Sequence, residues 1–443
     1  MKHLLKLGMG TVAALLAVLC LATSCKDSKD DVKDYDPSKP ITLTDFYPDS
    51  GGVATKVILN GDNFGGDASM IQVFFNDKPA AVIQAIGNKI YAICPRKPGE
   101  GDEQGLVNCK VTVKIGDKTV EYPNPFKYRI QTVVTTVCGI VGAPDDVVMG
   151  GLAQTSFPPA TYLAVDNDNN IFASLRNRNS YYNNNKVILV NEDEDVSRLL
   201  IPDTGAPLNQ PCMLDDGKTV YIPTDNHNDY WTMSSEDMWS PIKHQLKPTT
   251  GMSNFDIQFK HSFAMCTVDG YMYVRDKQGI LYKFEPETGL TSQVAAGLMS
   301  GSDSYTAFST KNPEVLYLAY TNNHCIYSYN IKTGAHTLIA GISGKSGYID
   351  GNGASAMFNE PRQLILDEND DMYIADTNNH CIRKVTPSGK VSTVIGQPGK
   401  SGYQDGSPEI ALFNRPFGVC LNKEGIIYVA DYENQCIRRL AIE

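Results

Sequence analysis

The sequence has little of what nucleic-acid, zinc and membrane-spanning proteins need. Its 39 Lys and Arg face 50 Asp and Glu, for a formal net charge of -11, and this argues against a nucleic-acid partner, which requires clustered Lys and Arg. The 11 cysteines form no CxxC pair and no Cys/His spacing suited to zinc. After the first segment, no apolar run is long enough to span a bilayer. The 443 residues, 42% of them hydrophobic, suffice for two folded cores.

The first 25 residues have the layout of an export signal. A positive head with Lys2 and Lys6 precedes an apolar stretch over residues 11–22, which closes on Leu21-Ala22-Thr23-Ser24-Cys25. This ending resembles a bacterial lipobox, which implies that residues 1–24 are a lipoprotein signal peptide and that Cys25 is lipidated. The alternative is an ordinary cleaved signal with an incidental cysteine.

A charged run follows Cys25 and resembles the surface-export signal of Bacteroidetes lipoproteins. Together with Pro37 and Pro40, it makes residues 25–40 a lipidated cysteine and flexible tether. The resemblance implies an outer-membrane protein that faces the cell exterior and meets the membrane only through its lipid. The alternative is a merely solvated tether.

Residues 41–128 read as a small β-sandwich. Short alternating runs such as Ile71, Val73 and Phe75 are separated by turn residues, with no helical period. Pro48 and the turn Gly61-Asp62-Asn63-Phe64 resemble the IPT/TIG family of Ig-like domains, a likeness that implies fold and says almost nothing about function. Cys94 and Cys109 could pair within this domain.

The rest of the chain, residues 129–443, repeats itself. Units beginning at Asn312, Pro361 and Pro416 share a strand, a turn, a β-branched strand ending in Ala, a polar loop and a strand that opens with Cys-Ile. The cysteines at this position, Cys325, Cys381 and Cys436, are predicted to be small buried strand residues. The last two units also share a connector, Asp-Gly…Ala-x-Phe-Asn-x-Pro, and this pattern resembles the NHL-repeat family.

Three more divergent units precede these, which predicts an all-β chain: an Ig-like sandwich followed by a propeller of six four-stranded blades. The last unit ends after its third strand. The segment that begins at Ile130 parallels the segment that begins at Lys390, in strand and in connector. We therefore expect the N-terminal strand of the propeller to complete the final blade and close the ring.

The loops between second and third strands open on the same face as the connectors, and there we expect a ligand. Amide and guanidinium groups match the paired hydroxyls of sugars, and aromatic rings stack on their apolar faces. The predicted binding residues are Arg176, Arg178, Tyr181, Tyr182, Asn183, Asn228, Tyr230, His324, His380 and Tyr432; the connectors add Tyr348, Arg362, Tyr403 and Arg415.

Some of these residues have a structural alternative. Asn322-Asn323-His324 and Asn378-Asn379-His380 repeat, so they could instead cap the same loop in two blades. Tyr181 and Tyr182 lie in an insertion, where function is often added. Of the two tryptophans, Trp231 aligns with Ile382 and is expected in the core, whereas Trp239 is either an exposed contact or a loop anchor.

The sequence offers no catalytic constellation. It contains no G-x-S-x-G motif, and Asp376 and Asp431 follow Ala at equivalent repeat positions, as expected of strand-end hydrogen bonding. We therefore predict no catalytic residues, no metal and no cofactor. Some propellers with related repeats are calcium-dependent lactonases or lyases, and Asp225 with the two repeat aspartates would be the candidate cluster.

The order of anchor, spacer and propeller resembles the surface glycan-binding lipoproteins of Bacteroidetes polysaccharide-utilisation systems. This likeness implies a non-catalytic protein that captures a polysaccharide or oligosaccharide beside an outer-membrane importer complex, its partner. A protein-interaction scaffold of an outer-membrane complex is the second reading, and a propeller lyase or lactonase the third.

Overall fold

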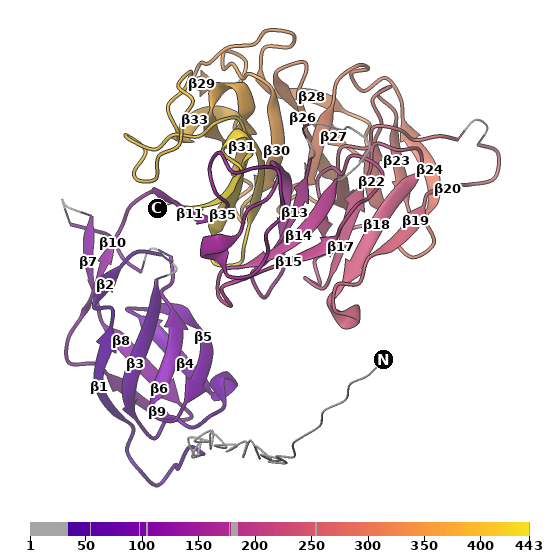
Figure 1. Cartoon of the computed structure of the whole chain (residues 1–443). Helices are drawn as coiled ribbons and strands as arrows, with labels where there is room; N and C mark the ends of the chain where they lie inside the picture. The colour runs from indigo at the N-terminus through magenta and orange to yellow at the C-terminus, as the bar shows by residue number, and fades with distance from the viewer. Residues whose placement is uncertain are drawn as a thin grey trace, which may run out of the picture.

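The computed structural model describes residues 34–442 except 54, 97, 103–104, 177, 179–184 and 253–254. Across these residues the chain is all-β, an N-terminal sandwich followed by a ring of six sheets, as predicted (Figure 1). No helix in the described ranges is long and apolar enough to cross a membrane. The predicted signal peptide and Cys25 lie outside the described residues.

The sandwich pairs a seven-stranded sheet with a three-stranded one. The larger runs β1 (Thr42–Tyr47), β3 (Lys56–Asp62), β6 (Lys89–Ile93), β5 (Lys78–Ile86), β4 (Ile71–Phe75), β8 (Val111–Ile115) and β9 (Lys118–Glu121), and the smaller runs β2 (Ser50–Gly51), β10 (Phe126–Arg129) and β7 (Leu106–Cys109). Alternate residues of β4 enter the core, where the Phe75 and Phe126 ring centroids lie 5.1 Å apart.

The Gly-x-Asn-Phe turn of the sandwich has a clear physical basis. Asn63 adopts a left-handed conformation with φ 63°, which asparagine tolerates better than most residues, and its Nδ2 donates to the carbonyl of Asp36 at 2.9 Å. Phe64 is buried in the core. Elsewhere in the sandwich Cys109 is a free, buried thiol, so the disulfide with Cys94 that the sequence left open is not formed.

The first three blades consist of short antiparallel strands in chain order from the axis outward. They are β12 (Ala160–Val165), β13 (Asn170–Leu175), β14 (Lys186–Asn191) and β15 (Val196–Ile201); β16 (Cys212–Met213), β17 (Thr219–Pro223), β18 (Asp229–Ser234) and β19 (Ile242–Gln245); and β21 (Phe263–Met265), β22 (Met272–Arg275), β23 (Leu281–Phe284) and β24 (Leu290–Ala295), with β20 (Lys247–Pro248) added beside β24.

The last three blades follow the same plan. They are β25 (Ser304–Phe308), β26 (Val315–Tyr320), β27 (Cys325–Asn330) and β28 (His336–Gly341); β30 (Pro361–Leu366), β31 (Met372–Asp376), β32 (Cys381–Val385) and β33 (Lys390–Ile395), with β29 (Gly351–Asn352) beside β33; and β34 (Pro416–Leu421), β35 (Ile426–Asp431), β36 (Cys436–Ala441) and β11 (Val133–Cys138). The cysteines that open β27, β32 and β36 are fully buried, as predicted.

Each blade buries its faces against its neighbours. One core cluster, for example, joins Ala319 and Ile326 of the fourth blade to Leu364 and Ile374 of the fifth. Trp231 packs in the cluster between the first two blades, and Trp239 anchors its turn there with its ring centroid 4.6 Å from that of Phe172. No single blade could bury these surfaces alone, so the ring is stable only as a whole.

The ring is closed by β11, the first strand of the propeller. It pairs with β36 in antiparallel register, from Val133 opposite Ala441 to Cys138 opposite Ile437. The prediction that the N-terminal strand completes the last blade is therefore confirmed. Because the final sheet gains its outer strand from the other end of the chain, no long edge is left unpaired there.

The sandwich contacts the propeller on the face opposite the loops between second and third strands. Lys56 Nζ lies 2.7 Å from Asp193 Oδ1 in the turn between β14 and β15, and Arg439 donates to the carbonyl of Val53 at 3.4 Å. That turn is on the far side of the blade from the β13–β14 loop. The loop face of the propeller, which carries the second-to-third-strand loops and the connectors, therefore points away from the sandwich (Figure 1).

Thr135 offers a direct test of ring closure. Val134 exchanges both backbone hydrogen bonds with Gly406, so the next residue, Thr135, turns its N–H toward β36, where it faces Arg439. The Thr135 side chain is exposed. Thr135→Pro should remove a closing hydrogen bond and destabilise the fold by about 1–3 kcal/mol, seen as a lower Tm in thermal unfolding.

Thr135→Ala keeps the N–H and serves as the control, with a Tm close to that of the parent. An unchanged Tm in the proline variant would show that the closing strand contributes little to stability.

A candidate ligand-binding site at the propeller axis

The first strands of the six blades surround a cavity of about 600 Å³. Each blade contributes to its wall, with Leu163, Cys212, Ala264, Ala307, Leu364 and Cys420 among the lining residues. The lining also includes Asp215, Thr267 and Asn422 from the turns on the side of the sandwich. The cavity is thus the axial channel of the propeller, and it extends toward the face that the sandwich contacts.

Contacts across the axis close the channel at the loop face. Tyr162 of the first blade and Tyr305 of the fourth, which is directly opposite in a ring of six, share a hydrogen bond between their hydroxyls. Beneath them, Gln363 accepts from the N–H of Leu163 at 3.0 Å and donates to its carbonyl at 2.7 Å. Both tyrosines are almost fully buried, so these side chains form a floor between the loop face and the channel.

We call the side chains on this floor the axial cluster; they are Tyr162, His261, Asp303, Tyr305, Arg362 and Phe417. Arg362 donates to the Tyr162 hydroxyl at 3.3 Å, and its guanidinium lies 4.1 Å from the Phe417 ring centroid. Tyr432 stacks on the other side of that ring, with the centroids 4.0 Å apart and the planes 5° from parallel. Aromatic and cationic groups from blades one, five and six therefore pack together at the axis.

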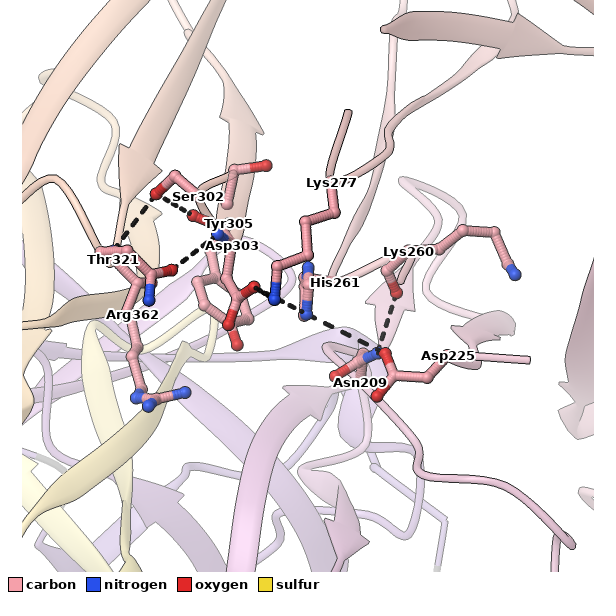
Figure 2. A network of polar contacts seen from close by, with 12 residues as sticks. Asn209, Asp225, Lys260, His261, Lys277, Ser302, Asp303, Tyr305, Thr321 and Arg362 are labelled. Atoms are coloured by element: carbon pink, nitrogen blue, oxygen red, sulfur yellow. Dashed lines mark hydrogen bonds and ion pairs between the residues drawn. The ribbon is translucent and has the colours of Figure 1, made fainter. Parts of the chain in front are cut away.

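A network of charges occupies the opposite half of the axis (Figure 2). His261 Nε2 lies 3.5 Å from Asp303 Oδ1 and 3.9 Å from Asp225, and Lys277 Nζ lies 3.2 Å from Asp303 Oδ1. Asn209 donates to Asp225 at 2.6 Å. Burial lowers the pKa of His261 and raises that of Tyr305, so at neutral pH both are uncharged hydrogen-bonding groups.

Lys260 supports the neighbouring loop. Its Nζ donates to the carbonyls of Asn226 and Ile257 at 3.2 and 2.8 Å, and also to that of His227. Burial lowers the pKa of Lys260 to about 7. With its donors bound to main-chain carbonyls, Lys260 fixes residues 226–228 next to the axis rather than presenting a charge to solvent.

Several buried polar atoms at the axis have no hydrogen-bond partner in the described part of the chain. They are Asn209 Oδ1, Gln210 Oε1, His261 Nδ1 and Arg362 Nε. Asn209 is 0% exposed, and Gln210 and His261 are each 6% exposed. Buried polar atoms in folded proteins are nearly always satisfied, so such a group of exceptions needs an explanation. A polar ligand with both donors and acceptors would satisfy them.

The structure places three of the predicted residues beside this cluster. Arg176 is half-buried and interacts electrostatically with Tyr162, Asp225 and Tyr432. Arg178 lies 3.3 Å from Glu433 on the rim. Tyr432, as described, stacks on Phe417. Tyr181, Tyr182 and Asn183 lie outside the described residues.

Three other predicted residues, His324, His380 and Asn228, hold neighbouring backbone segments in place through hydrogen bonds. The Nδ1 atoms of His324 and His380 accept the backbone N–H groups of Glu360 and Arg415, at 3.0 and 3.1 Å. Each histidine thus ties one blade's loop to the next blade's first strand, which is the capping alternative that their repetition suggested. Asn228 Oδ1 accepts from the N–H of Ile257 at 2.8 Å and fixes a connector in the same way.

Tyr230 is not on the loop surface. It is the second residue of β18, only 1% exposed, and its ring stacks on His244 with the centroids 5.1 Å apart. The sequence pattern placed it at the end of the loop, whereas the strand begins one residue earlier, at Asp229. The placement makes Tyr230 a packing residue.

The connector tyrosines lie on the outer rim, away from the axis. Tyr348 and Tyr403 occupy equivalent positions, with the guanidinium carbons of Arg383 and Arg438 at 4.8 and 4.9 Å from their ring centroids. Their hydroxyls contact the Oγ1 atoms of Thr393 and Thr136, each at 2.8 Å. The two rings cover the charged ends of these arginines and secure the connectors.

The sequence reading missed Tyr162, His261, Asp303, Tyr305 and Phe417. Phe417 and Arg362 follow the repeat prolines Pro416 and Pro361, at equivalent positions that begin the innermost strands. The residue that follows the repeat proline could therefore have been predicted to point toward the axis. In the more divergent blades the proline is absent, and the register of the first strand is not readable from the repeat.

Asp376 and Asp431 form buried ion pairs rather than a catalytic cluster. Asp376 Oδ2 lies 2.8 Å from Arg383 Nη1, and both side chains are 0% exposed. Asp431 and Arg438 repeat this geometry at 2.8 Å. Burial raises the pKa of each aspartate to about 6, so at pH 7 both remain largely ionised and paired. Among the described residues no group of three His, Cys, Asp or Glu side chains could hold a metal ion.

Removing one partner should expose the structural role of this pair. Asp376→Ala leaves the buried Arg383 with the carbonyls of Met357 and Ile349 and one carboxylate, that of Asp350, at 2.7 Å and with a side chain 41% exposed. We expect a loss of about 3 kcal/mol in the free energy of unfolding, measured by denaturant titration. Asp371→Ala breaks the partly exposed pair with Lys384 in the same blade and should cost at most about 1 kcal/mol.

If Asp376→Ala kept the parent's stability, the buried pair would not stabilise the blade, and a functional role for the Asp376 carboxylate would become the better explanation.

Two family models match parts of the chain. Residues 41–128 match the IPT/TIG domain, and residues 413–440 match the NHL repeat. The chain thus contains an IPT/TIG domain followed by an NHL-type propeller, in agreement with its fold.

Solved structures resemble the chain over nearly its whole length. A Bacteroides thetaiotaomicron protein of unknown function is 26% identical, with a TM-score of 0.66, over 93% of this chain and 100% of that one. An auxiliary nutrient binding protein from the same species is 25% identical, with a TM-score of 0.60, over 92% and 99%. Another auxiliary nutrient binding protein, from Bacteroides ovatus, is 23% identical with a TM-score of 0.62 and shares the fold.

Two curated relatives match a short part of the chain. The protein SUPPRESSOR OF QUENCHING 1, chloroplastic, of Arabidopsis thaliana is 30% identical over 129 residues, which are 28% of this chain and 12% of that protein. NHL repeat-containing protein 2 of Gallus gallus is 39% identical over 84 residues, 19% of this chain and 11% of the relative. The chain therefore spans only a small part of these relatives.

Proposed function

We propose that this protein is a non-catalytic cell-surface lipoprotein that captures a polysaccharide or oligosaccharide at the axial cluster. The observation that carries the proposal is the group of buried donors and acceptors around the axis that have no hydrogen-bond partner among the described residues. One of them, Gln210, lines the channel beneath the floor. A folded domain gains nothing from leaving such atoms unsatisfied. A glycan, which presents many hydroxyls that both donate and accept, suits this mixture of groups.

The rim of the site offers polar groups that a sugar can reach. Lys277 and Asp303 have side chains 41% and 21% exposed, and Asn322 is exposed. A carboxylate and an ammonium held together can accept from one hydroxyl and donate to the next, as sugar sites require. Tyr432, half-buried on Phe417, adds an aromatic edge close by.

The whole-chain likeness supports capture rather than catalysis. The Bacteroides thetaiotaomicron protein at 25% identity is described as an auxiliary nutrient binding protein, and a glycan is one class of nutrient that such a protein could bind. The proposal also includes lipidation of Cys25, outward display on the outer membrane and partnership with an importer complex. The N-terminal sequence supports lipidation and outward display, and the order of anchor, sandwich and propeller is the basis for the importer partnership.

Affinity electrophoresis of a soluble form that starts after Cys25, against a panel of plant, fungal and bacterial polysaccharides, tests the proposal. At least one glycan should retard the protein. Lys277→Ala should weaken that retardation about tenfold, because a hydrogen bond from a charged group is worth about 1.5–3 kcal/mol.

Lys332→Ala is the matched control, since Lys332 is also an exposed lysine and is paired with Glu314 in the fourth blade, whereas Lys277 belongs to the third. It should leave retardation unchanged. If no polysaccharide retards the protein while a neighbouring importer co-purifies with it, the scaffold function replaces this proposal.

A further inference from the structure

The half of the axis formed by blades five, six and one is rich in arginine. Arg176, Arg178, Arg362 and Arg415 gather there, and we call them the arginine sector. The carboxylates that pair with them on the rim are Glu360 and Glu433, while Asp225 faces Arg176 from the second blade. In a chain with a formal net charge of -11, four arginines against three carboxylates give this end of the proposed binding site a small excess of positive charge.

Arg362 is poorly satisfied within this sector. Its side chain is 14% exposed, and Nη2 reaches Glu360 Oε2 only at 3.3 Å. Nη1 meets the neutral Tyr162 hydroxyl at 3.3 Å, and Nε has no hydrogen-bond partner in the described chain. Hydrogen bonds between a guanidinium and a carboxylate are normally about 2.7–2.9 Å long and often paired, so this arginine is held by weaker contacts than its burial calls for.

Glu360 lies where a carboxylate could bind Arg362, but it makes only one of the two possible contacts. Its Oε2 lies 3.3 Å from Arg362 and 3.9 Å from Arg415 Nη2, and its side chain is 31% exposed. Nε and Nη2 form the side of a guanidinium that binds a carboxylate with two parallel hydrogen bonds. Glu360 contacts only the Nη2 half of that side, and Nε is left over.

The backbone keeps these groups in place. Glu360 and Arg415 both adopt left-handed conformations, with φ 58° and 55°, which are uncommon for such residues. Their N–H groups are bound by His324 and His380. Two equivalent restraints in adjacent blades therefore fix the points from which Glu360 and Arg415 reach toward Arg362.

We propose that the ligand of this site is an acidic glycan, and that a uronic acid carboxylate binds Arg362 side-on and displaces Glu360 from between Arg362 and Arg415. The inference rests on the proposed glycan binding and specifies its substrate class. A planar carboxylate would bind both Nε and Nη2, and the displaced Glu360 can turn outward because it is already partly exposed.

Binding is measured with polygalacturonate, alginate, carboxyl-reduced polygalacturonate and dextran sulfate at one salt concentration, because salt screens charge attraction. The soluble protein should be retarded by at least one uronate polymer, and more strongly than by the neutral reduced polymer or by dextran sulfate. Arg362→Gln should lower affinity for that uronate polymer at least tenfold.

Glu360→Gln is the decisive variant, because it removes the internal competitor and keeps the side-chain shape. It should raise affinity for the uronate polymer severalfold and leave neutral glycans unaffected, a gain that a purely structural role for Glu360 would not produce. Arg198→Gln, which removes an exposed arginine on β15 that is paired with Glu194 at 3.8 Å, is the control for charge and should change nothing.

Equal binding of the uronate and reduced polymers, stronger binding of dextran sulfate, or unchanged or weaker uronate binding by Glu360→Gln would overturn the inference. If a neutral glycan binds and Lys277→Ala abolishes that binding, the proposed function stands and only the acidic class falls. If Arg362→Gln is unstable, Glu360→Gln decides alone.

Discussion

The pairing of β11 with β36 is the constraint on which the rest of the propeller depends. It joins the first strand of the ring to the last, with Val134 opposite Leu440. Without it, the six sheets would form an open stack, and the first strands would not face one another around an axis. Tyr162 and Tyr305 meet only because their blades are opposite in a closed ring. Closing the ring therefore also brings together the side chains of the axial cluster.

Two kinds of buried polar groups follow from this architecture. One kind repeats with the blades: Asp376 with Arg383 and Asp431 with Arg438 are fully buried, paired and further bonded to Asn379 and Asn434. The other kind does not repeat. His261, Asp303 and Arg362 come from the same end of three first strands, yet each has different chemistry and incomplete bonding. Repetition marks the groups that hold a blade together, and departure from it marks the groups free to serve a ligand.

The contrast explains how far the sequence could lead. Local signals were enough for the alternation in β4, for the buried cysteines that open β27, β32 and β36, and for the closing strand, since each depends on neighbours in the chain or on a matching repeat. The axial cluster depends on contacts between residues as far apart as Tyr162 and Tyr305, which are separated by 143 positions. The residues of the axial cluster lie near the starts of strands, where the sequence places a strand's first residue least precisely. Tyr230, outside this cluster, shows the effect: its strand begins one residue earlier than predicted, and the tyrosine is buried instead of exposed.

The floor formed by Tyr162, Tyr305 and Gln363 has a consequence for how a ligand could bind. Since Tyr162, Tyr305 and Gln363 block the axis, a polymer cannot thread through the ring, although an axial channel lies directly beneath. If the protein binds a glycan as proposed, a long chain would lie across the loop face and could be held at any internal stretch, without a free end. Such binding would suit insoluble or branched glycans, whose chain ends are few and often out of reach.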